Sequence, residues 1–148
     1  TKRAKRPVVL IGHSLGGYLS LAYALRYPQH VQALVLIAAG PGFRKKEARD
    51  QWNAAIKRSA RKLNMPIGSE ELSMHIDSWV IDNLNKITAP TLVITGERDK
   101  RFAAAAEVFE KKLNVQASIV LPTAGHRLHV QLAGPVAKAI RDFLLELN

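Results

Sequence analysis

The chain has 148 residues, 47% of them hydrophobic, and a formal net charge of +10 at pH 7. That length and apolar content suffice for one domain with a sizeable core, and they exclude two full-sized domains. The chain contains no cysteine, which excludes disulfide bonds and thiol chemistry and is compatible with a cytoplasmic location, and no stretch approaches the ~20 apolar residues of a membrane span.

A short apolar strand, Val8-Val9-Leu10-Ile11, is the first predicted element, and a helix over 15–26 follows it. Between them lies Gly12-His13-Ser14-Leu15-Gly16, a Gly-x-Ser-x-Gly motif. On such a strand-to-helix turn the motif exposes a nucleophilic serine, and we expect the flanking glycines to leave room beside it. Ser14 is therefore the candidate nucleophile. The alternative is an ordinary glycine-rich turn with an incidental serine.

The middle of the chain predicts a strand over 33–38 and then two amphipathic helices, over 44–63 and 69–84. We expect these helices to form a small two-helix lid over 41–85, inserted into a single domain whose core comprises 7–40 and 86–148.

Trp52 and Trp79 lie on the apolar stripes of the two predicted lid helices. They are candidate substrate-binding residues, because a lid over the nucleophile could line an acyl pocket. The alternative is that both indoles pack against the edge of the sheet.

Two more buried strands are predicted over 91–95 and 117–121, each followed by a polar loop and then a helix. Asp99 lies in the first of these loops and His126 in the second. Because the carboxyl ends of parallel strands meet at one edge of a sheet, both side chains can approach Ser14 there. A serine nucleophile needs a histidine base, and the imidazole needs an acid that fixes its tautomer.

The order Ser14, Asp99, His126 on three successive strand ends resembles the α/β-hydrolase superfamily, whose chain order is nucleophile, acid, histidine. The resemblance implies an α/β fold with a mostly parallel open sheet of about four strands flanked by helices. It also implies that Ser14 attacks an acyl carbonyl, that His126 moves the proton, that Asp99 orients His126, and that the amide of Leu15 is one oxyanion-hole donor. The function expected is hydrolysis of carboxyl esters or related acyl substrates of small size.

The chain departs from this family before the nucleophile strand, where the family has about four further strands and a loop with the second oxyanion donor. Only six residues precede Pro7. We therefore expect the chain to resemble the C-terminal half of a hydrolase, with a strand edge at Val8-Val9-Leu10-Ile11. That edge would pair with a second copy or with a complementing N-terminal fragment. The alternative function is an incomplete, non-catalytic hydrolase fragment that serves as a basic binding module.

The positive charge is concentrated in two places rather than spread evenly. This charge suggests a surface for nucleic acid, anionic lipid or an acidic partner. The alternatives are a solvated face of an amphipathic helix, or a half-protein whose missing half is acidic. No recognition motif accompanies the charge, so we expect no nucleic-acid binding. The basic residues concerned are Lys2, Arg3, Lys5 and Arg6 at the start, and Arg44, Lys45, Lys46, Arg49, Lys57, Arg58, Arg61 and Lys62 in the first lid helix.

Two further histidines lie near the predicted site. His13 is a candidate substrate-binding residue, and it is expected to pack rather than to act as a base because it points away from Ser14. His129 could replace His126 only if the loop register shifted. No pair of His, Asp or Glu has metal-ligand spacing and no phosphate-binding loop occurs, so no metal or cofactor is implied.

Overall fold

The computed structural model describes residues 7–147. The predicted basic cluster from Lys2 to Arg6 lies outside the described residues. The chain divides into two compact units, one formed by Gly42–Asp82 and the other by the described residues on either side of that segment. The larger unit carries the sheet.

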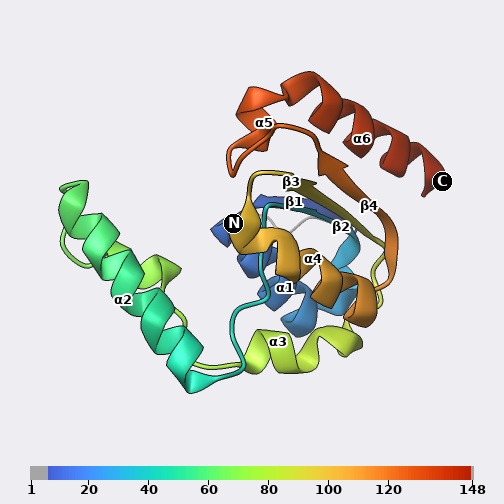
Figure 1. Ribbon diagram of the computed structural model, residues 1–148. Coiled ribbons are helices and arrows are strands. Elements are labelled where there is room, and N and C mark those ends of the chain that lie inside the picture. Colours follow the sequence, from blue (N-terminus) through green and yellow to red (C-terminus); the bar gives the residue numbers. More distant parts are fainter. Residues whose placement is uncertain (1–6, 148) are drawn as a thin grey trace. The chain divides into compact units, whose positions relative to one another are not determined.

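The sheet of the larger unit has four parallel strands in the order β1-β2-β3-β4 (Figure 1). This confirms the predicted fold class, an open parallel α/β sheet. The two central strands are buried almost throughout, as expected for parallel strands covered on both faces. The strands are β1 Val8–His13, β2 Val31–Ile37, β3 Thr91–Gly96 and β4 Val115–Leu121.

Helices cover both faces of this sheet. In Figure 1, α5 and α6 lie on one face and α1 and α4 on the other. None of the helices within residues 7–147 is long and apolar enough to cross a membrane. The elements are α1 Leu15–Arg26, α4 Lys100–Lys112, α5 Leu128–Gln131 and α6 Ala133–Glu146, with 3-10 turns η1 Pro28–His30 and η3 Leu84–Lys86.

One buried core cluster lies between the sheet and α6. Alternate residues along β2 and β3 point to this face because side chains alternate in a strand. Helix α6 contributes two of the core residues. The buried cluster includes Ala33, Val35 and Ile37 of β2, Leu92 and Ile94 of β3, and Val136 and Phe143 of α6.

Within the described residues, β1 pairs with β2 alone and is therefore an edge strand. Its Ile11 side chain is exposed at 53%. An edge with unpaired backbone groups and an exposed apolar side chain can accept another strand. The pairing of this edge with a second copy or a complementing fragment stays a prediction.

The smaller unit contains α2 Lys46–Lys62, η2 Ser69–Ser73 and the start of α3 Trp79–Asn83. The continuous second lid helix predicted over 69–84 is wrong, because the backbone is extended at Met74. Side chains of α2 form hydrogen bonds with backbone groups that would be hydrogen-bonded within the segment itself in a continuous helix. Asn53 bonds both the N–H and the carbonyl of His75, each at 2.8 Å.

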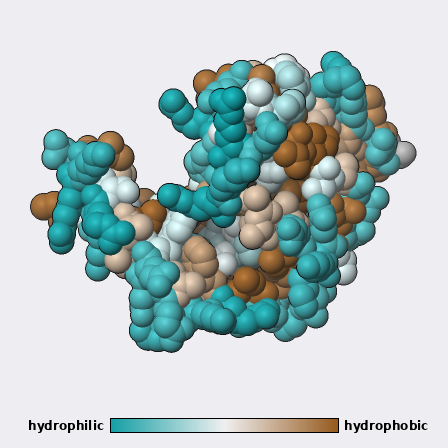
Figure 2. All heavy atoms as spheres, in the orientation of Figure 1, coloured by the Kyte–Doolittle hydropathy of each residue, from teal (hydrophilic) through white to brown (hydrophobic). Residues whose placement is uncertain are grey.

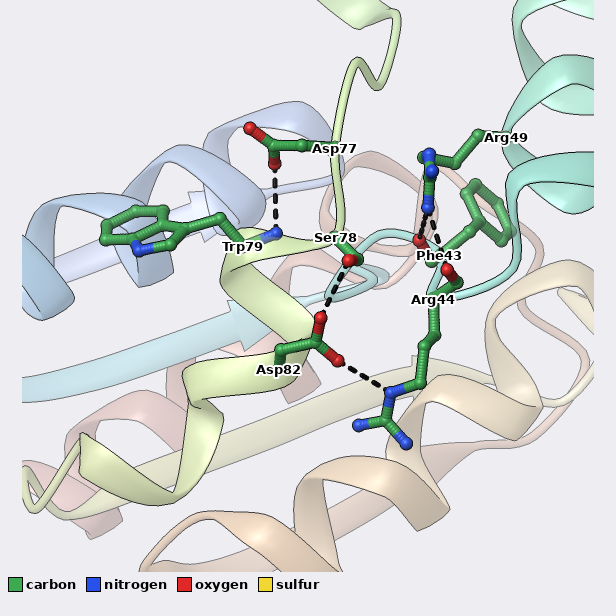
Figure 3. A network of polar contacts seen from close by, with 7 residues as sticks. All are labelled: Phe43, Arg44, Arg49, Asp77, Ser78, Trp79 and Asp82. Carbon is green, nitrogen blue, oxygen red and sulfur yellow. Dashed lines mark hydrogen bonds and ion pairs between the residues drawn. The ribbon is translucent and has the colours of Figure 1, made fainter.

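Polar contacts tie the two ends of the smaller unit together (Figure 3). Asp82 accepts hydrogen bonds from Ser78 Oγ and from Arg44 Nε, both at 2.7 Å. These bonds lower the pKa of Asp82, the bond from Ser78 most strongly. Arg49 Nη1 donates to the carbonyls of Phe43 and Arg44. The segment that enters the unit is thereby fastened to the one that leaves it.

The basic side chains near the end of α2 are exposed, and so are the apolar side chains that follow them. Figure 2 shows hydrophilic atoms along this segment, with hydrophobic atoms beside them. The basic residues at the end of α2 therefore lie on a solvated helix face, as one interpretation of the charge expects. The residues are Lys57, Arg58, Arg61 and Lys62, followed by Leu63, Met65 and Ile67.

Candidate functional site

Ser14 joins the last residue of β1 to the first residue of α1 in a strained conformation, with φ 53° and ψ −116°. A positive φ costs a non-glycine residue about 1–3 kcal/mol and persists only where the surroundings impose it. Here the Ser14 N–H donates to the Ile37 carbonyl at the end of β2, at 2.9 Å. The predicted turn is therefore present, and it holds the serine at the carboxyl edge of the sheet.

The glycines of this turn differ in what they allow. A Cβ on Gly12 would lie 2.4 Å from the Gly16 carbonyl carbon, and one on Gly17 would lie 2.3 Å from the Ala39 Cβ. A Cβ on Gly16 would meet no described atom within 4 Å. The steric reason predicted for both flanking glycines thus holds for Gly12, is wrong for Gly16, and applies instead to Gly17.

We expect Gly12→Ala and Gly17→Ala each to lower the free energy of unfolding by about 1–3 kcal/mol, since both force an atom into occupied space. Gly16→Ala is the matched control, because it adds the same methyl group to open space. Its effect should stay within about 0.5 kcal/mol. Thermal or urea unfolding of the three variants measures the difference, and equal losses in all three would contradict this explanation.

The structure brings together the three side chains that the sequence placed on separate strand ends. His126 Nδ1 lies 2.7 Å from Asp99 Oδ2, and His126 Nε2 lies 3.0 Å from Ser14 Oγ. A carboxylate only accepts, so Nδ1–H donates to Asp99 and Nε2 is left to accept from the Ser14 hydroxyl. The Asp99 side chain is 7% exposed and the His126 side chain 39% exposed.

Ser14 and Asp99 share a second property, because each is the residue that precedes a helix. Ser14 is the N-cap of α1 and Asp99 the N-cap of α4, and neither side chain makes a capping hydrogen bond. Serine and aspartate at this position normally cap the helix, worth ~1 kcal/mol. Both side chains instead bond to the same imidazole. Two side chains of types that cap helices well thus bond to His126 and leave the helix ends uncapped.

Close contacts between two loops position His126. A Cβ on Gly96 would lie 2.5 Å from the Ala124 carbonyl oxygen, so only glycine lets the end of β3 approach the loop that carries His126. The Arg98 N–H donates to this same carbonyl at 2.9 Å. The Glu97 carboxylate also accepts from the Thr123 N–H at 2.7 Å. These contacts join the loop of Asp99 to the loop of His126.

Phe102 was not predicted from the sequence, and its ring stacks on the His126 ring with centroids 4.9 Å apart and planes at 18°. Phe102 lies in the first turn of α4, three residues after Asp99, and residues at this spacing share a helix face. That spacing was the available signal. The ring of Phe102 thus packs on one face of the imidazole that bonds to Asp99.

His13 contacts the histidine loop rather than open space. Its Nε2 lies 2.8 Å from the His126 carbonyl oxygen, so Nε2–H donates to it. The His13 ring lies 4.1 Å from the His129 ring and 4.9 Å from the His126 ring, centroid to centroid. His129 thus packs against His13, and its buried Nδ1 has no hydrogen-bond partner within the described residues. His126, not His129, bonds to Ser14.

Burial lowers the pKa of His13 in the larger unit and of His75 in the smaller one, below the usual 6.5. The unfolded chain therefore binds more protons than the folded chain as the pH falls through about 6.5. We expect the free energy of unfolding to fall in this range and to level off below the folded-state pKa values. Urea unfolding between pH 8 and pH 5 should show the decline, and His13→Gln should reduce it. A flat profile would contradict the lowered pKa values.

Both tryptophans lie in the smaller unit. Trp52 Nε1 donates to the Ser73 carbonyl at 2.8 Å, and the indole packs near Phe43 and His75 at centroid distances of 5.5 and 6.1 Å. Trp79 is 38% exposed. Trp52 thus holds α2 against the end of η2 and the residues that follow it. A substrate-binding role for either indole stays a prediction.

No group of three or more His, Cys, Asp or Glu side chains within residues 7–147 is arranged to hold a metal ion. The Ser14 hydroxyl bonds to the His126 imidazole, which in turn bonds to the Asp99 carboxylate. Such groups suit nucleophilic attack with proton transfer.

Known proteins resemble this chain in sequence and in fold. Residues 4–63 match a family model described as "alpha/beta hydrolase fold". A Bacillus subtilis protein named "Putative 2-succinyl-6-hydroxy-2,4-cyclohexadiene-1-carboxylate synthase" is 28% identical in an alignment 182 residues long. The alignment covers 95% of this chain and 66% of the relative.

Two solved structures have the same fold. MenH from S. aureus superposes with a TM-score of 0.79 at 19% identity, over 95% of this chain and 69% of that one. A thermophilic esterase from Thermogutta terrifontis superposes with a TM-score of 0.72 at 22% identity, over 96% and 66%. The chain spans 55–62% of the length of three further curated relatives.

Proposed function

We propose that this chain, which matches an α/β-hydrolase fold model over residues 4–63 and shares the fold of solved relatives, is a serine hydrolase. Its substrates are carboxyl esters or related small acyl compounds. Ser14 is the nucleophile, His126 the general base and acid, and Asp99 the residue that orients His126. The Thermogutta esterase supports the ester class, because it shares the fold that carries these three residues.

One observation carries this proposal: two side chains that normally cap helices both bond to one imidazole. A serine at φ 53° adds strain to the cost of the lost cap. Structural needs alone favour capped helices and relaxed backbone. A site that gives up both, in hydrogen-bond order hydroxyl, imidazole and carboxylate, matches the requirements of nucleophilic catalysis.

The reaction follows from the hydrogen bonds. Ser14 Oγ attacks the ester carbonyl carbon while its proton passes to His126 Nε2, and Asp99 stabilises the imidazolium through Nδ1–H. The tetrahedral intermediate collapses, the C–O bond to the alcohol breaks, and the alkoxide takes the proton from Nε2. Water then attacks the acyl-enzyme, giving its proton to Nε2, and the acid is released as Ser14 regains a proton.

The amide of Leu15 is the proposed oxyanion donor of this chain. Leu15 is the first residue of α1, and the first N–H groups of a helix have no acceptor within the helix. The positive end of the helix dipole also favours an oxyanion at this place. The helix that follows Ser14 thereby supplies both a donor and a favourable field.

We also propose that the chain has a core over 7–40 and 86–148 and a lid over 41–85. The lid is expected to influence which acyl chains are accepted, with Trp79 the more exposed of its two indoles. Trp79→Ala should then change the preference for acyl length more than turnover of the shortest ester.

Hydrolysis of p-nitrophenyl esters of increasing acyl length tests the proposed function. We expect saturable hydrolysis that Ser14→Ala eliminates. Equal hydrolysis by the wild-type chain and Ser14→Ala would contradict the proposal. A folded wild-type chain without hydrolysis would favour the alternative, a non-catalytic binding module.

A further inference from the structure

We propose that His13 is a positioning residue that fixes the backbone of His126 relative to Ser14. The inference rests on the proposed function and extends it to a residue that does not itself touch the reacting atoms. His13 precedes Ser14 directly in the chain, and its side chain bonds to the backbone of His126, 113 residues away. It therefore links the nucleophile and the base by a route separate from their own contact.

The link has a direct geometric effect. Ser14 Oγ and His126 Nε2 lie 3.0 Å apart, and that distance depends on where two loops from different strands lie. Asp99 and Phe102 constrain the ring of His126, but neither contacts the elbow through these interactions. The bond from His13 Nε2–H to the His126 carbonyl, at 2.8 Å, runs from the elbow itself. A displacement of a catalytic group by about 1 Å can lower the rate by ~10²-fold.

The surroundings of His13 keep its ring in place and uncharged. Its ring packs between those of His126 and His129, and burial is the largest cause that lowers the pKa of His13. The hydrogen bond to the His126 carbonyl raises this pKa in part, and the charges that face His13 act in both directions, His129 and His126 lowering the pKa and Asp99 raising it. A neutral His13 still donates from Nε2, and it places no positive charge beside His126 when that ring becomes an imidazolium.

Three variants separate the hydrogen bond from titration and packing. In His13→Gln the side-chain amide reaches about as far as imidazole Nε2, so it keeps a donor but cannot titrate. In His13→Leu the donor is lost. His30→Leu is the control, because His30 bonds to the Tyr23 hydroxyl at the other end of α1, at 3.2 Å.

We expect His13→Leu to lower the kcat for p-nitrophenyl acetate by about 10–100-fold while KM changes less than about threefold, the pattern of a lost transition-state arrangement. His13→Gln and His30→Leu should both stay within about threefold of wild type. Equal losses in His13→Leu and His13→Gln, or wild-type turnover in His13→Leu, would overturn the proposal.

A second readout does not require turnover. The Nδ1 proton of His126, shared with Asp99, should give a downfield proton NMR signal in the wild-type chain and in His13→Gln. In His13→Leu this signal should broaden or shift, because the loop of His126 is no longer tied to the elbow. An unchanged signal in His13→Leu would overturn the positioning role. If the wild-type chain hydrolyses no ester, the proposed function fails, while the signal still decides whether His13 positions His126.

Discussion

Ser14→Ala and His126→Gln are each expected to lower the kcat of ester hydrolysis by on the order of 10⁴-fold or more, because hydroxyl and imidazole act as one unit. The double variant should be little worse than either single variant for the same reason. Steady-state kinetics on a p-nitrophenyl ester measures all three.

His129→Gln is the comparison that tests the identity of the base. His129 packs against His13, whereas His126 bonds to Ser14, so His129→Gln should cost far less than His126→Gln. Circular dichroism and unfolding should show that all variants keep the fold. A larger loss of kcat in His129→Gln than in His126→Gln would mean that His126 is not the base.

Asp99→Asn is expected to lower kcat by on the order of 10³–10⁴-fold. The amide of asparagine can donate to His126 Nδ1, which moves the imidazole proton to Nε2 and removes the acceptor for the Ser14 hydroxyl. The substitution changes size very little, so the fold should survive. Kinetics on the same ester, with unfolding curves beside it, measures the effect.

Asp82→Asn is a suitable control, because Asp82 accepts hydrogen bonds from Arg44 and Ser78 within the smaller unit. It should leave kcat within about threefold, since exposed ion pairs contribute little. Comparable losses in the two variants would mean that Asp99 acts on the stability of the chain and not on the tautomer of His126.

The fold and the neighbourhood of Ser14 could be predicted because short stretches of sequence determine them. The apolar run 8–11 followed by a Gly-x-Ser-x-Gly motif and a helical pattern fixes a strand, a turn and a helix, and α1 has the bounds that the pattern predicted. The meeting of Ser14, Asp99 and His126 follows from topology, since loops at the carboxyl ends of parallel strands share one edge.

Features that depend on distant contacts could not be predicted in this way. The segment 69–84 has a helical pattern, yet Asn53 of α2 binds the backbone of His75 and opens the helix. Likewise, the need for glycine at position 17 arises from Ala39, a residue beyond the next strand. The bond from His13 to the carbonyl of His126 depends on a loop more than a hundred residues away. Local periodicity contains no information about such partners.

Covalent labelling with a fluorophosphonate tests most directly whether Ser14 is an activated nucleophile. The reagent's phosphorus bonds to Ser14 Oγ as fluoride leaves, so intact-mass and peptide mass spectrometry locate the adduct. We predict a single adduct on Ser14 of the folded chain, absent from Ser14→Ala and strongly slowed in His126→Gln and Asp99→Asn. A folded chain that remains unlabelled, or that carries its adduct on another residue, would contradict this role of Ser14.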